Sequence, residues 1–198
     1  MMMARKKGNG RKRILMIAVV LLLLGVGFIV YQRYVRAGIA YPAENLTVTS
    51  TAFENGGMMP VRYTGRGEDV SPDLHFGPLS DKAQSVAIVM DDLDHPIGAY
   101  NHWVIFNIPA GISNIPQNVP KGETVASLGD AIQGRSDYGG KHYYRGPKPP
   151  FGTHKYVFRV YVLDVFLNLN ADANKTALLK AMEGHILQYG TLTGSFGN

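Results

Sequence analysis

Residues 156–165 read YVFRVYVLDV, and only Arg159 and Asp164 in this stretch are charged. Apolar side chains occupy both sets of alternating positions, whereas a strand with one face in water carries polar residues at every second position. The stretch therefore predicts a central β-strand that is covered on both faces. Two shorter apolar runs, residues 85–90 and 103–108, are bounded by turn residues and predict further buried strands.

The sequence around these strands predicts a mostly β domain with one helix near its C-terminal end. Residues 46–53 alternate in polarity and are rich in β-branched residues, which is typical of a strand. Asn174 is a candidate N-cap for a helix that extends to Gly190, with apolar residues at helical spacing: Leu178, Leu179, Met182 and Ile186. Residues 45–198 are enough for one domain with a single core.

The first 36 residues differ from the rest in charge and hydropathy. They hold eight of the twenty Lys and Arg residues and none of the fifteen acids, so their formal charge is +8, and the remaining 12 bases and 15 acids give −3. Residues 14–30 carry no charge, and a membrane-spanning helix needs roughly 17–25 apolar residues. We therefore expect three N-terminal segments: a basic cytoplasmic tail (residues 1–13), a transmembrane anchor (residues 14–31) and a tether (residues 32–44).

The same charge asymmetry predicts a topology. Six basic residues precede the apolar segment, and only Arg33 and Arg36 closely follow it. The positive-inside rule then predicts a single-pass protein of the cell membrane, with its N-terminus in the cytoplasm and the β domain on the extracytoplasmic side. The small-x-small stretch Gly38-Ile-Ala40 lies well beyond the apolar residues, which favours an uncleaved signal anchor over a cleaved signal peptide.

Composition argues against several classes of function. The domain after the N-terminal segments is mildly acidic, which does not indicate a nucleic-acid-binding surface. The chain has no cysteine, so it has neither a disulfide framework nor thiolate chemistry. It also contains no H-E-x-x-H zinc motif and no G-x-S-x-G nucleophile elbow.

Residues 90–103, MDDLDHPIGAYNHW, place three acids and two histidines at the end of a predicted strand. Successive side chains of a strand alternate between faces, so Asp92 and Asp94 can point the same way. Asp91 then points to the opposite face, where we expect a solvated or loop-capping acid. The cluster is compatible with a metal cage, an acid/base pair or a pocket for a charged ligand.

Two histidines are candidates for this site, one inside this stretch and one far from it in the sequence. His102 begins the next predicted strand and lies near Asp92 or Asp94 if the two strands are neighbours. His154 and Tyr156 open the long strand directly after a proline-rich loop. The remaining histidines are expected to be ordinary surface or hydrogen-bonded residues: His75, His95, His142 and His185.

Taken together, an ordered set of motifs resembles the phosphatidylethanolamine-binding protein family, in its prokaryotic, Raf-kinase-inhibitor-like branch. The motifs are Asp92-Leu-Asp-His-Pro96, Asn101-His-Trp103, Gly146-Pro-Lys-Pro-Pro150 and Gly152-Thr-His-Lys-Tyr156, preceded by Ser71-Pro-Asp-Leu-His-Phe76. The likeness runs from about residue 47 to the C-terminus. It implies a β-sandwich of two packed sheets with a peripheral C-terminal helix and a pocket at one end.

The resemblance also implies which residues bind a ligand. Carried over position by position, the anion-binding pocket consists of Asp92, Asp94, His102, His154 and Tyr156, with a wall shaped by Gly146, Pro149 and Pro150. Three positions depart from the family motifs without removing a pocket residue: Leu93 replaces Pro, Phe76 replaces Trp and Lys155 replaces Arg.

The implied chemistry is recognition of a phosphate. An aspartate that accepts from one imidazole nitrogen orients the ring and favours its protonated form. The other nitrogen then donates to a phosphate-sized anion, beside the tyrosine hydroxyl. A spare carboxylate is available for an attached ammonium, as in phosphoethanolamine.

We therefore expect a membrane-anchored binding module for a phosphate-bearing small molecule or a phospholipid headgroup, with no enzymatic activity, cofactor or metal. One alternative is an inhibitor or interaction module for an extracellular or envelope protease or a kinase. Another is a metal-dependent or acid/base hydrolase that uses Asp92, Asp94, His102 and His154. The sequence leaves the natural ligand, any protein partner and the oligomeric state open.

Overall fold

The computed structural model describes residues 14–26, residue 28 and residues 44–198. Contacts divide the chain into two units, residues 1–39 and 40–198. In the first unit, residues 14–26 and 28 are helical and their side chains are exposed. The predicted basic tail (residues 1–13) and the predicted tether, apart from residue 44, lie outside the described residues.

The prediction of an N-terminal transmembrane helix is wrong. Across the described parts of the chain, no helix is both long enough and apolar enough to cross a membrane.

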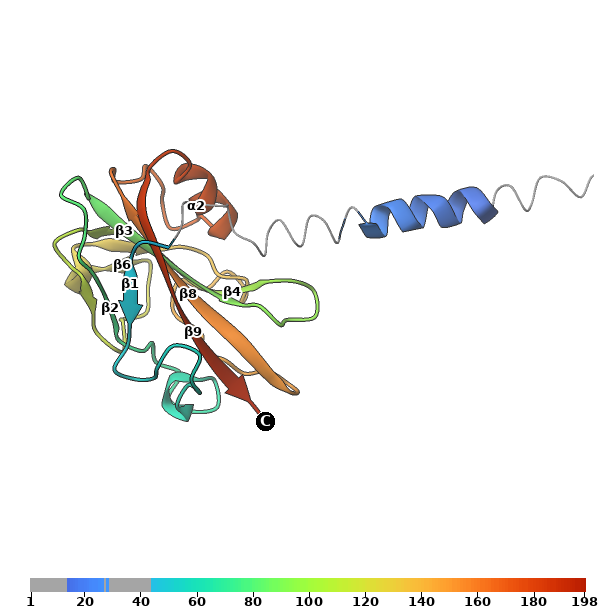
Figure 1. The fold of residues 1–198 in the computed structure, drawn as a ribbon, viewed down its shortest axis with the longest axis horizontal. Coiled ribbons are helices and arrows are strands. Elements are labelled where there is room, and N and C mark those ends of the chain that lie inside the picture. Colours follow the sequence, from blue (N-terminus) through green and yellow to red (C-terminus); the bar gives the residue numbers. More distant parts are fainter. Residues whose placement is uncertain (1–13, 27, 29–43) are drawn as a thin grey trace, which may run out of the picture. The chain divides into compact units, whose positions relative to one another are not determined.

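Residues 44–198 form two antiparallel sheets, which pack as a β-sandwich (Figure 1). The smaller sheet has the order β1-β2-β5, with bounds Thr47–Thr49, Leu74–Gly77 and Asn114–Ile115. The larger sheet has the order β6-β7-β4-β3-β8-β9, with bounds Thr124–Val125, Ala131–Gln133, Tyr100–Pro109, Ser85–Asp92, Thr153–Leu163 and Ile186–Gly197. The helices of this unit are the 3-10 turns Val61–Tyr63 and Ala126–Leu128 and the α-helix α2, Lys175–Ala181. The prediction of a mostly β sandwich is confirmed.

Strand β8 lies between β3 and β9 and is covered on both faces, as its sequence predicts. Phe158 and Val160 join the core between the two sheets, while Tyr161 and Leu163 face a second core. Helix α2 closes this second core with Leu178. Each such side chain stabilises the fold by about 1.5–3 kcal/mol on full burial.

The C-terminal region differs from its prediction. Asn174 caps α2 as expected, because its side chain accepts a hydrogen bond from the backbone N of Ala177 (3.0 Å). The helix, however, ends at Ala181 instead of Gly190, and the 12-residue strand β9 follows. Along β9 every second residue from Gly190 to Phe196 is buried, so a period of two was present in the sequence.

Candidate functional site

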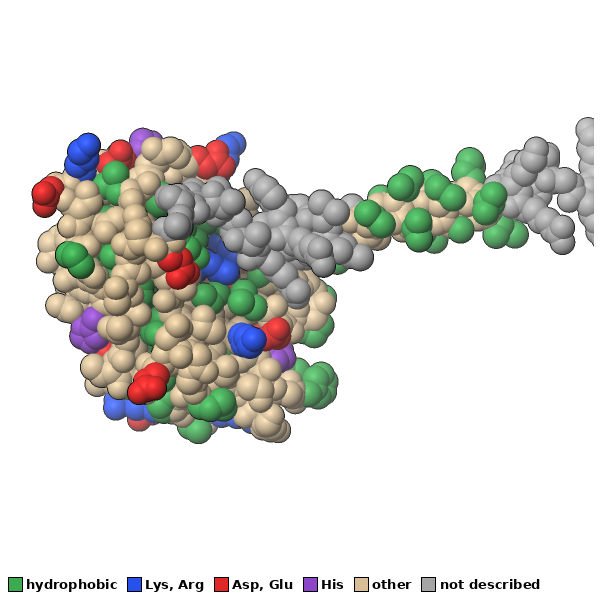
Figure 2. Space-filling view, viewed as in Figure 1, with side chains coloured by type: hydrophobic (Ala, Val, Ile, Leu, Met, Phe, Trp, Pro, Cys, Tyr) green, Lys and Arg blue, Asp and Glu red, His purple; other side chains and the backbone are tan. Residues whose placement is uncertain are grey.

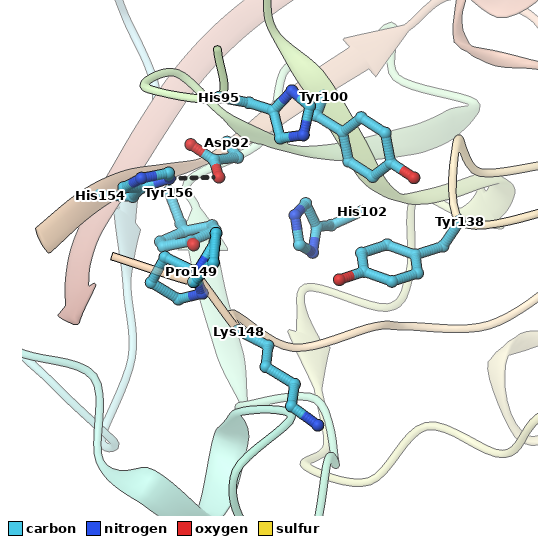
Figure 3. Close-up of a pocket in the computed structure, with 10 residues that line it drawn as sticks. Asp92, His95, Tyr100, His102, Tyr138, Lys148, Pro149, His154 and Tyr156 are labelled. Atoms are coloured by element: carbon cyan, nitrogen blue, oxygen red, sulfur yellow. Dashed lines mark hydrogen bonds and ion pairs between the residues drawn. The ribbon is translucent and has the colours of Figure 1, made fainter. Parts of the chain in front are cut away.

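A cavity of about 150 Å³ opens where three strands of the larger sheet meet (Figure 3). In this antiparallel sheet, the end of β3 lies beside the starts of β4 and β8, and Asp92 pairs with both Tyr100 and Tyr156. Side chains far apart in the sequence therefore converge. The cavity is lined by Asp92, His95, Tyr100, His102, Tyr138, Lys148, Pro149, Pro150, His154 and Tyr156.

Asp92 organises one side of the cavity. Its Oδ2 accepts a hydrogen bond from Nδ1 of His154 (2.7 Å), and its Oδ1 accepts one from the backbone N of Asp94 (2.8 Å). Burial, the charge of Asp92 and a hydrogen bond to Asp92 all raise the pKa of the Tyr156 hydroxyl. That hydroxyl therefore keeps its proton at neutral pH and donates it to the Asp92 carboxylate.

The His102 ring has a different hydrogen-bond partner from the expected aspartate. Its Nδ1 donates to the carbonyl oxygen of Arg145 (2.7 Å), not to an aspartate. Burial lowers the pKa of His102, so its ring is neutral at neutral pH. The expectation that an aspartate orients the imidazole and favours its protonated form is therefore wrong for His102. The carbonyl of Arg145, not a carboxylate, lies at hydrogen-bond distance from Nδ1.

The structure places two of the predicted site residues beside the cavity and not in its lining. The Asp94 carboxylate accepts from the backbone N of Lys155 (2.8 Å) and so ties the turn after β3 to β8. Gly146 supports the wall from behind, since a Cβ there would lie 2.5 Å from the carbonyl oxygen of Tyr63. Asp92 is the only acid among the described lining residues, and both of its oxygens already accept hydrogen bonds. The geometry thus offers no spare carboxylate for an ammonium.

Four lining residues were not predicted: His95, Tyr100, Tyr138 and Lys148. The rings of His95 and Tyr100 stack with centroids 4.5 Å apart, and the Tyr138 ring lies edge-on to His102 at 5.2 Å. Figure 3 shows the Tyr138 hydroxyl directed toward His102 and the Lys148 side chain extending away from it. Lys148 stands inside the recognised proline motif, so a signal for it existed. Tyr138 lies in an irregular loop, and no local pattern marks it.

Asp91 lies on the opposite face of β3, as strand alternation predicts, but it is fully buried. Its carboxylate accepts from Arg159 Nη1 (2.5 Å), Lys175 Nζ (2.8 Å) and Asn101 Nδ2 (3.1 Å). The expectation of a solvated or loop-capping acid is therefore wrong, because α2 covers this face and brings Lys175 to the carboxylate.

The lining groups suit an oxyanion better than a cation. The Tyr138 hydroxyl is a potential donor, the O–H of Tyr156 and Nδ1 of His154 donate to Asp92, and Lys148 adds a positive charge at the wall. Among the residues that the structure describes, no group of three His, Asp or Glu side chains is arranged to hold a metal ion. Hydrogen bonds from such donors to a charged oxygen are shorter and stronger than those between neutral groups.

Comparison with known proteins gives concordant matches. Residues 49–197 match the family described as phosphatidylethanolamine-binding protein. A UPF0098 protein of Archaeoglobus fulgidus is 46% identical over 154 residues, which cover 78% of this chain and 52% of the relative. This chain thus spans about half the length of that relative. A UPF0098 protein of Pyrococcus abyssi is 43% identical over 155 residues, covering 77% of this chain and 86% of the relative.

Two crystal structures share the fold. A putative phosphatidylethanolamine-binding protein homolog of Chlamydia trachomatis has a TM-score of 0.70 and 30% identity, covering 79% of this chain and 99% of that chain. Escherichia coli YbcL, described as a new member of the mammalian PEBP family, has a TM-score of 0.72 over the same shares of the two chains. Its identity is 24%, so this likeness concerns the fold alone.

Proposed function

The chain belongs to the phosphatidylethanolamine-binding protein family, and on that premise we propose that its cavity binds a phosphate-bearing small molecule or a phospholipid headgroup. In this proposal the protein is a binding module and not an enzyme. The observation that carries the proposal is the convergence of Tyr138, Tyr156 and His154 on one cavity of about 150 Å³.

The charge balance of the cavity supports an anionic guest. The Asp92 carboxylate is turned toward His154 and the backbone N of Asp94, and it accepts a hydrogen bond from each. The Tyr138 hydroxyl remains a donor for a ligand, and Lys148 supplies a cation at the wall. A hydrogen bond to a charged group contributes about 1.5–3 kcal/mol, so two or three of them are enough for specific binding of a small anion.

Substitution of Tyr138 tests this proposal with little disturbance of packing. Tyr138→Phe removes one donor and keeps the ring, so we expect the affinity of the full-length protein for inorganic phosphate to fall by about tenfold. Isothermal titration calorimetry measures the change. Tyr143→Phe is the matched control, because Tyr143 lies outside the cavity lining and its ring contacts Lys121.

The proposal fails if neither phosphate nor phosphoethanolamine binds the wild-type protein at millimolar concentration. It also fails if Tyr138→Phe and Tyr143→Phe bind phosphate as tightly as the wild type, since the anion would then lie elsewhere.

A further inference from the structure

Resting on the proposed phosphate site, we propose that the cavity selects a phosphate that retains a P–OH group, and that His102 Nε2 accepts the hydrogen bond from it. The ligand class is then inorganic phosphate or the monoanion of a phosphate monoester. Phosphodiesters and sulfates, which present no such hydrogen, are disfavoured.

The tautomer of His102 follows from its partner. A carbonyl oxygen can only accept, so the 2.7 Å contact with Arg145 places a hydrogen on Nδ1. A neutral imidazole then carries a lone pair on Nε2. This nitrogen forms no hydrogen bond with any residue that the structure describes, and His102 lines the cavity (Figure 3). The cavity therefore presents an acceptor among its donors.

The surroundings keep this acceptor neutral. The rings around His102 are Tyr100 on β4, Tyr138 from the loop after β7 and Tyr156 on β8, and the last is edge-on at 5.3 Å. Burial and, to a smaller extent, the nearby His95 lower the pKa of His102. The hydrogen bond to the Arg145 carbonyl and the charges of Asp92 and Asp91 act in the opposite direction without reversing the shift.

A buried acceptor discriminates between ligands, because a ligand that has no hydrogen to donate leaves the acceptor without a hydrogen bond. Inorganic phosphate keeps at least one P–OH at neutral pH, and a monoester keeps one up to a pH of about 6. Sulfate has nearly the same shape but no hydrogen, so one of its oxygens would face the lone pair of Nε2. Sites that hydrogen-bond a hydroxyl reject analogues that lack it, because the polar group of the site is then left unsatisfied.

The decisive comparison is calorimetric titration of the full-length protein at pH 6.0 with two matched pairs of ligands. We expect inorganic phosphate to bind at least about tenfold more tightly than sulfate, and phosphoethanolamine more tightly than glycerophosphoethanolamine. Because the first pair is nearly isosteric, its preference does not reflect ligand size.

A second arm uses pH. Between pH 6 and pH 8 phosphoethanolamine loses its P–OH, whereas inorganic phosphate still carries one. The affinity for phosphoethanolamine should therefore fall relative to that for phosphate.

Substitution of His102 locates the effect. An amide at this position can donate N–H, so His102→Gln should reduce the preference for phosphate over sulfate to threefold or less. His185→Gln is the matched control, since His185 pairs with Asp164 at the far end of β8 and should keep the full preference. If His102→Gln does not fold, the wild-type ligand pairs and the pH ratio decide by themselves.

The outcomes separate the two proposals. Equal affinity for phosphate and sulfate overturns the role of His102 and leaves the phosphate site standing. Absence of binding by all four ligands overturns both. A preference that persists in His102→Gln assigns the selection to another residue and also overturns the inference.

Discussion

His102 and His154 differ in what holds their imidazole rings, and this difference sets their roles. Asp92 accepts from Nδ1 of His154, whereas a backbone carbonyl accepts from Nδ1 of His102. Burial lowers the pKa of His102 and keeps its ring neutral, although the hydrogen bond to the Arg145 carbonyl acts in the opposite direction. Two histidines that look alike in the sequence are therefore held by different partners at one cavity.

The buried neutral His102 predicts a pH dependence of folding. Its pKa is lowered in the folded state, so the unfolded chain binds a proton more readily below the ordinary histidine pKa of about 6.5. Stability from this residue is fully present above that pH and is lost as the pH falls, by up to about 1.4 kcal/mol per pH unit. Urea unfolding at pH 7.5 and 5.5 measures the loss.

Replacement of His102 shows how much of this pH-dependent loss of stability comes from that residue. His102→Gln should lose less stability between pH 7.5 and 5.5 than the wild type, whereas the exposed His185→Gln should follow the wild type. An identical loss in all three proteins would mean that His102 is not the group that takes up the proton.

At this scale, much of the site could be predicted from the sequence, but not all of it. Asp92, His154 and Tyr156 stand in recognisable motifs at strand ends, and the structure brings them to the cavity. The partner of His102 could not be predicted, because a backbone carbonyl carries no signature in the sequence. Tyr138 reaches the site only through tertiary folding.

Among the elements, β3 connects the two faces of the larger sheet. Asp92 points to the cavity from one face, and Asp91 points from the other into the ion pairs with Arg159 and Lys175. Because these acids are adjacent, the buried ion pairs fix the end of β3 from which Asp92 reaches His154. Helix α2, which carries Lys175, thereby supports the cavity from a distance.

Removal of the buried acid should therefore be costly. Asp91→Ala leaves two cations without their carboxylate, and breaking a buried pair in this way costs about 3–5 kcal/mol. Lys175→Met leaves the Arg159 pair intact, so we expect a smaller loss. Chemical denaturation compares both with Asp81→Ala, an exposed acid whose loss should change stability by no more than about 0.5 kcal/mol. Equal stability of Asp91→Ala and Asp81→Ala would contradict this role of the ion pairs.

The sequence predicts a strand most accurately where the strand is buried on both faces. Strand β8 is apolar on both faces, and its pattern was unambiguous. Strand β1 is shorter than the stretch 46–53, because Asp73 accepts from the backbone N of Thr51 (2.8 Å) where the strand would continue. Strand β9 was missed because Ile186 extends the helical spacing of α2, although pairing with β8 along its whole length overrides that spacing.

For the whole molecule, the hydropathy of a segment does not by itself determine its structure. The apolar composition of residues 14–30 predicted a membrane span, but no described helix is long and apolar enough to cross a membrane. The body formed by residues 44–198 shows scattered Lys and Arg on the face in Figure 2, with no continuous basic patch. The cavity lined by Asp92, His102, Tyr138 and His154 remains the feature of this body that calls for a ligand.

A crystal structure of the protein with inorganic phosphate tests the central claim most directly. The account predicts a phosphate in the cavity of Asp92 and His154, with one oxygen within about 3 Å of His102 Nε2 and another at hydrogen-bond distance from the Tyr138 hydroxyl. A cavity that stays without phosphate at saturating concentration, or a phosphate bound only at another surface, would contradict it.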